Sequence, residues 1–487
     1  MIEQTPNAPI HGLPGVANAA ANAGGHGHSR APAIAAAECA TEYATECATE
    51  CAQPQPWHVA PRTVADTGID ITMLGTLLMK AAYLYRNVTL LQLAETLRLP
   101  GSVIGEIATA CVRERLLEVA HRGASDLDVR YRLTDAGHAR AAEFAARCSY
   151  AGPAPVTLDA YLEAVRHHSV RHASVSKADV AAALGDLVAP PHIVDEAGIA
   201  LNSSTALLLY GPPGSGKTFL ARRLRELMPG AVPVPHAITV AGEIIQVFDP
   251  LVHVPFDEGG NPGWRRGADR RWILCHRPAV LTGGELTLDM LDLRYDAVAG
   301  YYQAPPHMKA NNGVYIVDDL GRQLVGVSEL LNRWIVPLDR GIDMFTLHSG
   351  VRFSVPFDVW PVFSTNLDLS ALGDDAFLRR LGSKLFIGPL AEDDYREVYA
   401  RAARALGLQH ADDVFRFLLE GLHLADGIPL LACIPGDLLK LVDSARRYHG
   451  DPPHVSEEAL RRAWHAYFGR EIGDGMRWRS GARVAPR

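Results

Sequence analysis

The sequence predicts a doubly wound α/β domain with a parallel sheet over about residues 191–390, and three stretches carry this prediction. "TALLLYGPPGSGKTFLARRL" places an apolar strand at 205–210, a glycine-rich loop and an amphipathic helix in succession. "VYIVDDLGRQ" is a second apolar strand, which runs into two aspartates. "FDVWPVFSTNLDL" is a third, which ends in polar residues. Buried strands that alternate with helices are typical of parallel sheets covered on both faces.

Composition narrows the class of protein. The 487 residues leave room for about three domains, and 48% apolar with 21% charged residues is ordinary for a globular chain. With a net charge of −8, the whole chain lacks the excess of positive charge that is typical of nucleic-acid-binding proteins. No apolar run reaches the roughly 20 residues that span a bilayer, and the N-terminus lacks the pattern of a signal peptide. Seven cysteines without disulfide-framework spacing fit a reducing compartment, so we expect a cytoplasmic protein without membrane insertion.

The glycine-rich loop matches the nucleotide-binding pattern G-x-x-x-x-G-K-[ST] and stands between a strand and a helix, as that pattern requires. Its glycines let backbone N–H groups face phosphate oxygens, and the N-terminus of the following helix adds positive charge. The lysine would contact the β- and γ-phosphates of ATP, and the threonine would offer its hydroxyl to Mg²⁺. The residues expected to bind the nucleotide are Gly211, Pro212, Pro213, Gly214, Ser215, Gly216, Lys217 and Thr218.

Asp318 and Asp319 follow about 100 residues later, at the end of the second strand. Two adjacent carboxylates would repel each other and lose solvation unless a cation or a reacting proton accounts for them. With an ATP site present, they fit the Walker B acids. Asp318 would hold Mg²⁺ through water, and Asp319 would orient and deprotonate the attacking water.

Two further groups complete the expected catalytic set. The third strand ends in Ser364, Thr365 and Asn366, and a polar residue there, Asn366, could fix the attacking water. Arg379 and Arg380 close a short helix from which one of them could reach the nucleotide of a second copy. An arginine supplied in this way is worth about 10³–10⁵ in rate. A solvated basic pair is the alternative.

The order of these motifs, with helices after residue 391, resembles the AAA+ ATPases over roughly residues 185–470. After residue 66 the chain is similar to a bacterial family of winged-helix AAA+ proteins, labelled predicted ATPases with chaperone activity associated with Flp pilus assembly. Among the stretches that carry this resemblance are "GGELTLDMLDLRYD", "GYYQAPPHMKANNGVYIVDDLGRQ" and "ELLNRWIVPLDR". It implies a Mg²⁺-dependent ATPase that forms a homo-oligomeric ring, a hexamer, and acts on a protein partner such as a pilus or secretion component.

Three features depart from the AAA+ pattern. Most AAA+ proteins have Asp-Glu where this chain has Asp318-Asp319, so the base reaches less far by one methylene and we expect slow turnover. Gly436 stands where many AAA+ lids carry an arginine, and Lys440, one helical turn on, is a poor substitute. Pro361 interrupts an apolar strand, which predicts a bulge or a shifted strand boundary.

We expect six segments along the chain. They are a disordered low-complexity tail (1–66), a winged-helix domain (67–150), a helical linker (151–190), the ATPase core (191–390), a helical lid (391–470) and a basic tail (471–487). In the tail, the repeat "ECATEYATECATECA" favours disorder over a metal site.

The winged-helix prediction rests on three helices followed by a hairpin within residues 67–150. These residues carry ten Lys or Arg against nine Asp or Glu. That balance is weak for a phosphate-binding surface, so protein docking is favoured over DNA.

Several alternatives stay open at this point. Tyr301 and Tyr302, on an expected hairpin, could grip a partner polypeptide in a pore, although core packing is favoured. His253 could belong to a site, although a structural role is favoured. For the whole chain, the rivals to a protein-remodelling ATPase are a DNA-linked regulator and a nucleotide-binding scaffold with little hydrolysis.

Overall fold

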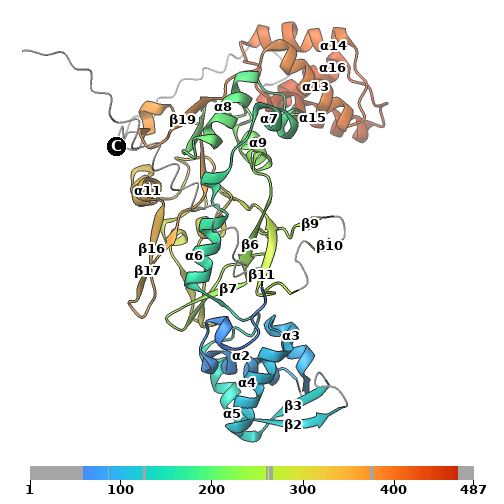
Figure 1. The fold of residues 1–487 in the computed structure, drawn as a ribbon. Helices are drawn as coiled ribbons and strands as arrows, with labels where there is room; N and C mark the ends of the chain where they lie inside the picture. Colours follow the sequence, from blue (N-terminus) through green and yellow to red (C-terminus); the bar gives the residue numbers. More distant parts are fainter. Residues whose placement is uncertain are drawn as a thin grey trace, which may run out of the picture. The chain divides into compact units, whose positions relative to one another are not determined.

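The computed structural model describes residues 59–85, 87–123, 128–258, 261–262, 267–372 and 378–469 (Figure 1). The cysteine repeat, most of the predicted tail and the basic C-terminal segment lie outside the described residues. Residues 59–66, which we assigned to the tail, are packed against the next domain. Val64 is buried, the Ser102 hydroxyl donates to the carbonyl of Arg62, and the Glu106 carboxylate accepts from the Val64 N–H at 2.8 Å. The folded part therefore begins earlier than predicted.

The first folded region is a helical domain with a small sheet. Its strands pair in the order β1-β3-β2, with antiparallel neighbours. The α3 helix begins at a capping box in which Thr89 and Gln92 satisfy each other's backbone N–H groups. The elements are α2 (Ile71–Tyr83), β1 (Val88–Thr89), α3 (Leu90–Leu97), α4 (Gly101–Arg113), β2 (Leu117–Arg122), β3 (Val129–Leu133) and α5 (Asp135–Arg147).

The segment predicted as a helical linker contains helices and one short strand. The helices are α6 (Leu158–His167) and α7 (Lys177–Leu184), and α8 (Pro191–Asn202) follows with proline at its first position. The strand β4 (Val156–Thr157) was not predicted, and it pairs in parallel with β7 (Ala237–Val240).

A five-stranded sheet forms the centre of the structure, and every neighbouring pair in it is parallel. The strand order is β12-β15-β18-β5-β19, so each connection crosses from one strand to another over a face of the sheet. The strands are β5 (Leu207–Tyr210), β12 (Ala279–Thr282), β15 (Val314–Val317), β18 (Trp360–Thr365) and β19 (Ser383–Phe386).

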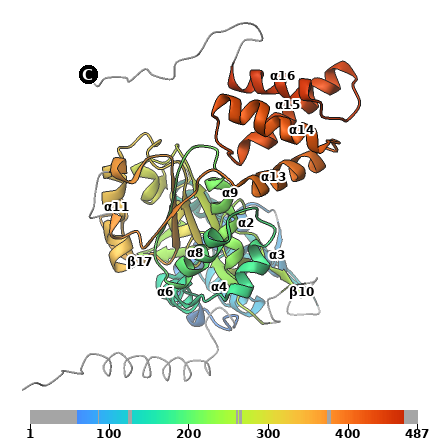
Figure 2. The ribbon, with the colours of Figure 1, turned by 90° about the horizontal axis from the view of Figure 1, so that it is seen from above.

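Both faces of this sheet are covered, as the apolar strands predicted. Alternate residues of each strand point to opposite faces, so Leu207 and Leu209 pack in one apolar cluster and Leu208 packs in another. The first cluster includes α8 and α9 (Lys217–Arg223), and the second includes α11 (Val327–Arg340). Figure 2 shows α8 and α9 on one side of the strands and α11 on the other.

Pro361 is accommodated without a bulge. It pairs with Tyr315 of β15 in an unbroken register, and β18 begins at Trp360, three residues after the predicted boundary at Phe357. The Trp360 N–H donates toward β15, so the next residue along faces β5. Because the pairing with β5 begins only at Val362, the N–H that proline lacks is not needed in the ladder.

The residues between the glycine loop and the Asp318-Asp319 pair, together with β4, build a second sheet in the order β13-β14-β8-β7-β4. β13 (Arg294–Asp296) and β14 (Tyr301–Gln303) form the expected hairpin, and β7 and β8 (Glu243–Gln246) form another. Two further antiparallel pairs are β6 (Ala231–Pro235) with β11 (Trp272–His276), and β16 (Ile342–Thr346) with β17 (Arg352–Pro356). Short strands β9 (Asp257–Glu258) and β10 (Asn261–Pro262) also pair.

Tyr301, Tyr302 and His253 have structural roles. Tyr302 is 2% exposed, and Tyr301 packs edge-on against Tyr150 with ring centroids 5.5 Å apart. Both therefore belong to the core rather than to a gripping loop. The two ring nitrogens of buried His253 are engaged by the N–H of Asp249 at 2.9 Å and the carbonyl of Lys309 at 2.8 Å. This leaves His253 no nitrogen for catalysis or metal binding.

The C-terminal region is helical and has an apolar core of its own, as predicted for the lid. Its elements are α13 (Glu392–Ala405), α14 (Asp412–Arg416), the π-helix Phe417–Leu424, α15 (Cys433–His449) and α16 (Glu457–Phe468). Among the described helices, none has the length and apolar composition that crossing a membrane requires.

Candidate functional site

The glycine loop adopts the conformation that its composition predicts. Gly211, Gly214 and Gly216 have φ angles of +142°, +79° and +100°, a region that side chains rarely allow. A Cβ atom on Gly211 would lie 2.3 Å from the carbonyl oxygen of Ile387. The loop leads directly into α9, which begins at Lys217. The backbone N–H groups at this helix start are those that an anion would meet.

Lys217 is held inside the loop. Its Nζ donates to the carbonyls of Gly211 at 3.0 Å and Pro212 at 2.8 Å, and the residue is 5% exposed. Burial lowers the pKa of Lys217, and the charges of Asp319 and Asp318 offset part of that shift. The ammonium group is thus held by the loop, where it could donate to a phosphate oxygen in place of the carbonyls.

Asp318 lies at the carboxyl end of β15 and contacts the loop, as the sequence predicted. Its Oδ1 accepts hydrogen bonds from the Thr218 hydroxyl at 3.0 Å and from the Ser364 hydroxyl at 2.6 Å. A hydroxyl and a carboxylate are the hard oxygen donors that suit Mg²⁺, which usually takes only one or two protein carboxylates beside substrate phosphates. The described residues accordingly hold no cluster of three or more His, Cys, Asp or Glu side chains that could bind a metal.

The carboxylate of Asp319 contacts Asn366. Asp319 has a φ of +51°, and its Oδ1 accepts from the Asn366 amide at 2.9 Å. Asp319 and Asn366 both line the large cavity beside the loop, whereas Ser364 and Thr365 do not. The structure therefore brings the predicted base and the predicted polar residue together on the cavity wall.

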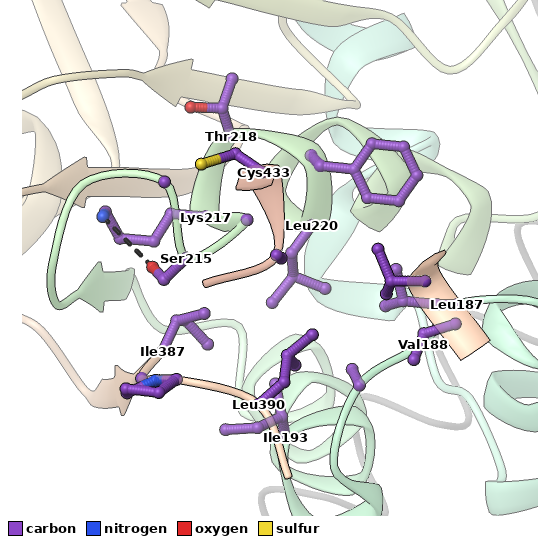
Figure 3. Close-up of a pocket in the computed structure, with 18 of the residues that line it drawn as sticks. Leu187, Val188, Ile193, Ser215, Lys217, Thr218, Leu220, Ile387, Leu390 and Cys433 are labelled. Carbon is purple, nitrogen blue, oxygen red and sulfur yellow. Dashed lines mark hydrogen bonds between the residues drawn. The ribbon is translucent and has the colours of Figure 1, made fainter. Parts of the chain in front are cut away.

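The cavity has a volume of about 830 Å³ and two chemically different ends. In Figure 3 the loop residues Ser215, Lys217 and Thr218 lie at one end. Apolar side chains line the rest of the cavity, and they come from the α7–α8 connection, α8 and the segment after β19, with Ile387 beside the loop: Leu187, Val188, Ile193, Ile387 and Leu390. An apolar slot beside a phosphate cradle suits a purine base joined to a polyphosphate.

This apolar end was missed from the sequence. Its residues come from two segments about 200 positions apart, and neither carries a recognisable motif. The Pro190-Pro191 pair is the one sequence signal near this end of the cavity. It places α8 and, with it, Ile193 against the cavity.

The lid contributes four residues to the cavity wall: Val398, Arg401, Ala432 and Cys433. Gly436 and Lys440 are not among the described residues that line it, and Lys440 instead forms an ion pair with Asp437 at 3.3 Å. Arg401 donates to the carbonyl of Asp186 and to Glu397. Positions 436 and 440 therefore place no side chain on the cavity wall in this arrangement.

The two candidate arginines lie outside the cavity wall formed by the described residues. Arg380 makes a two-point ion pair with Asp339 at the end of α11, with distances of 2.7 and 2.8 Å. Arg379 is exposed. This ion pair joins Arg380 to its own chain. Arg380 is therefore not the fully solvated side chain that the alternative interpretation described.

Two family models match parts of the chain. The model described as "Magnesium chelatase, subunit ChlI" matches residues 183–241, which include the glycine loop, and a domain of unknown function, DUF8689, matches residues 391–466. A search of the curated proteins found no match. The sheet order, the loop and the matched segment together show a P-loop α/β domain with a parallel sheet.

Solved structures of two proteins are similar to the chain. NtrX from Brucella abortus, in complex with ATP, is 15% identical, with 62% of this chain and 60% of that chain covered and a TM-score of 0.36. The RuvB Holliday junction branch migration motor of Thermotoga maritima is 17% identical, with 61% and 72% covered and a TM-score of 0.33. A mutant of the same RuvB is 14% identical, with 58% and 72% covered and a TM-score of 0.35.

Proposed function

We propose that the chain is a Mg²⁺-dependent ATP hydrolase of the AAA+ class. The observation that carries this proposal is the arrangement of Lys217, Thr218, Asp319 and Asn366 around one partly apolar cavity. Asp318 does not line this cavity but accepts a hydrogen bond from Thr218, which does. A bound triphosphate and its metal ion require a glycine loop that leads into a helix, next to acids at a strand end. Ion pairs that only stabilise a fold do not require this arrangement.

Each side chain has a definite task in this reaction. Lys217 binds the β- and γ-phosphates, and Thr218 and Asp318 hold the metal. Asp319 accepts the proton of the attacking water, and Asn366 orients Asp319 through the 2.9 Å hydrogen bond. Bound Mg²⁺ would neutralise charge on the phosphate oxygens. Arg379 or Arg380 would complete the site of a second copy in a homo-oligomeric ring, proposed to be a hexamer.

The direct test is phosphate release from ATP at increasing protein concentration, with light scattering to follow assembly. We expect Mg²⁺-dependent turnover that rises more steeply than linearly as copies associate. A protein that stays monomeric and releases no phosphate at high concentration would remove the proposal.

We further propose that the protein remodels or helps to assemble a protein partner, with pilus or secretion components as candidates. The fold of α2, α3, α4 and the β2–β3 hairpin supports a winged-helix domain. In helix-turn-helix proteins the recognition helix presents its N-terminal residues to the DNA groove. Here Ser102 and Glu106, in the corresponding half of α4, are engaged by residues 62–64 of the chain itself. This contact favours protein docking over DNA.

The DNA-linked alternative makes a separate prediction. Arg130 and Arg132 lie on the exposed face of β3, where they could meet phosphates, and Arg132 also forms an ion pair with Glu118 at 2.6 Å. We expect the full chain to bind a short duplex only nonspecifically, with a Kd no tighter than about 10⁻⁶ M at physiological salt, and R130E/R132E to leave that binding unchanged. Tighter, salt-dependent binding that this double variant abolishes would favour a DNA-linked regulator.

A cytoplasmic location stays a prediction. It is supported by the four described cysteines, Cys111, Cys148, Cys275 and Cys433, which are free thiols. Burial raises the pKa of the Cys111 thiol to about 11 and that of Cys275 to about 12, so these two are structural rather than reactive.

A further inference from the structure

We infer that Ser364 is a positioning residue for the metal-binding carboxylate, and that it sets how strongly nucleotide binding depends on Mg²⁺. The inference rests on the proposed function, since it concerns the same ATP site. Ser364 is the last but one residue of β18, is 0% exposed and does not line the cavity. It therefore acts through Asp318 rather than on the nucleotide.

The two oxygens of Asp318 have different surroundings. Oδ1 accepts from three donors: the Ser364 hydroxyl at 2.6 Å, the Thr218 hydroxyl at 3.0 Å and the Asp319 N–H at 3.1 Å. Among the described residues no donor contacts Oδ2. A carboxylate oxygen with three donors has little capacity left for a cation, so Oδ2 is the oxygen available to the metal or its water.

Of these three donors, Ser364 is the one to which we assign no other role at the site. Thr218 must turn its oxygen toward the metal, and the backbone of Asp319 sits in a strained left-handed conformation. The shortest bond, from Ser364, keeps Oδ1 engaged whichever way the other two move. A hydrogen bond to a charged group is stronger than one between neutral groups.

The strand β18 thereby holds both acids. Ser364 fixes Asp318, and Asn366, two residues on, fixes Asp319. The intervening Thr365 points elsewhere, because its hydroxyl donates to the carbonyl of Leu320 at 2.7 Å. The alternation of side chains along a strand explains why positions 364 and 366 face the acids and 365 does not.

The test is the Mg²⁺ dependence of binding a non-hydrolysable ATP analogue to the full chain, measured by fluorescence titration with Mg²⁺ and in EDTA. Ser364→Ala is expected to raise the Mg²⁺ concentration at half-maximal binding by about tenfold, while the affinity in EDTA stays within about twofold of wild type. Ser364→Thr, which keeps the hydroxyl, should restore much of the Mg²⁺ dependence. Thr365→Val is the matched control, equally buried and hydrogen-bonded, and should leave the midpoint unchanged.

An unchanged midpoint in Ser364→Ala, or an equal rise in Thr365→Val, would overturn the inference. If Ser364→Ala does not fold, Ser364→Cys decides, because it keeps the volume and donates only weakly. A rise of the midpoint in that variant supports the inference and no rise overturns it. Wild-type protein that binds no analogue at all would refute the proposed function itself, whereas normal wild-type binding with an unaltered Ser364 variant refutes only the role of Ser364.

Discussion

Replacing Asp319 by asparagine is expected to lower ATP turnover by about 10²–10⁴ while leaving Mg·ATP binding within a few fold of wild type. The amide keeps the size of the side chain and a contact to Asn366, but it cannot accept the proton of the attacking water. Metal binding should persist, because Asp318, Thr218 and Ser364 form a separate hydrogen-bonded group. Steady-state phosphate release and equilibrium nucleotide binding, measured on the same preparation, check both halves of this prediction.

Asp368→Asn serves as the control for this variant, since Asp368 is exposed and follows the same strand end without lining the cavity. It should turn over ATP at the wild-type rate. Equal, near-zero rates in wild type and Asp319→Asn, with binding intact in both, would instead favour the nucleotide-binding scaffold. The shorter reach of Asp319 and the glycine at position 436 are the features that make this rival worth testing.

Lys217→Ala is expected to weaken ATP binding by about a hundredfold or more and to abolish turnover. The substitution removes the one lysine that the loop encloses, and charge-assisted hydrogen bonds to phosphate are among the strongest that proteins make. Fluorescent-nucleotide titration measures the loss of affinity. Lys177→Ala, at a surface ion pair with Asp195, should leave the affinity unchanged.

A thermal-unfolding curve separates this effect from misfolding. Lys217→Ala leaves the carbonyls of Gly211 and Pro212 without their donor, so some loss of stability is expected. Wild-type affinity in a folded Lys217→Ala protein would contradict the assigned role of the loop. So would a loss of affinity that Lys177→Ala reproduces.

The sequence predicted the phosphate end of the site because each part of it depends on local chemistry. A glycine loop between a strand and a helix has few other uses, and two acids at the end of an apolar strand need a cation. Strand ends of a parallel sheet meet at one edge, which brings Asp318 near Thr218 and Asn366 near Asp319 although they are far apart in sequence.

What the sequence did not predict depends on long-range packing. The apolar end of the cavity joins Leu187 and Ile387, which no spacing rule connects. The ion pair of Arg380 with Asp339 follows from where α11 ends against the next segment. Residues 59–66 were assigned to the tail because low-complexity sequence precedes them, yet Glu106 and Ser102 supply hydrogen-bond partners that composition does not reveal.

Ser364 shows the same limit on a smaller scale. Of the polar residues at the end of the third strand, only Asn366 was predicted to act on the attacking water, and of the three only Asn366 lines the cavity. Ser364 instead contacts Asp318, the acid proposed to hold the metal. Which neighbour a strand-end side chain meets depends on the register between β15 and β18, and register is fixed by the packing of the whole sheet.

Isothermal titration of the wild-type chain with Mg·ATP tests the central claim most directly, because the cavity is proposed to exist for a triphosphate and its metal ion. Saturable heat corresponding to one nucleotide per chain, reduced when Mg²⁺ is removed with EDTA, is the predicted result. No heat of binding from folded protein at millimolar Mg·ATP would contradict it.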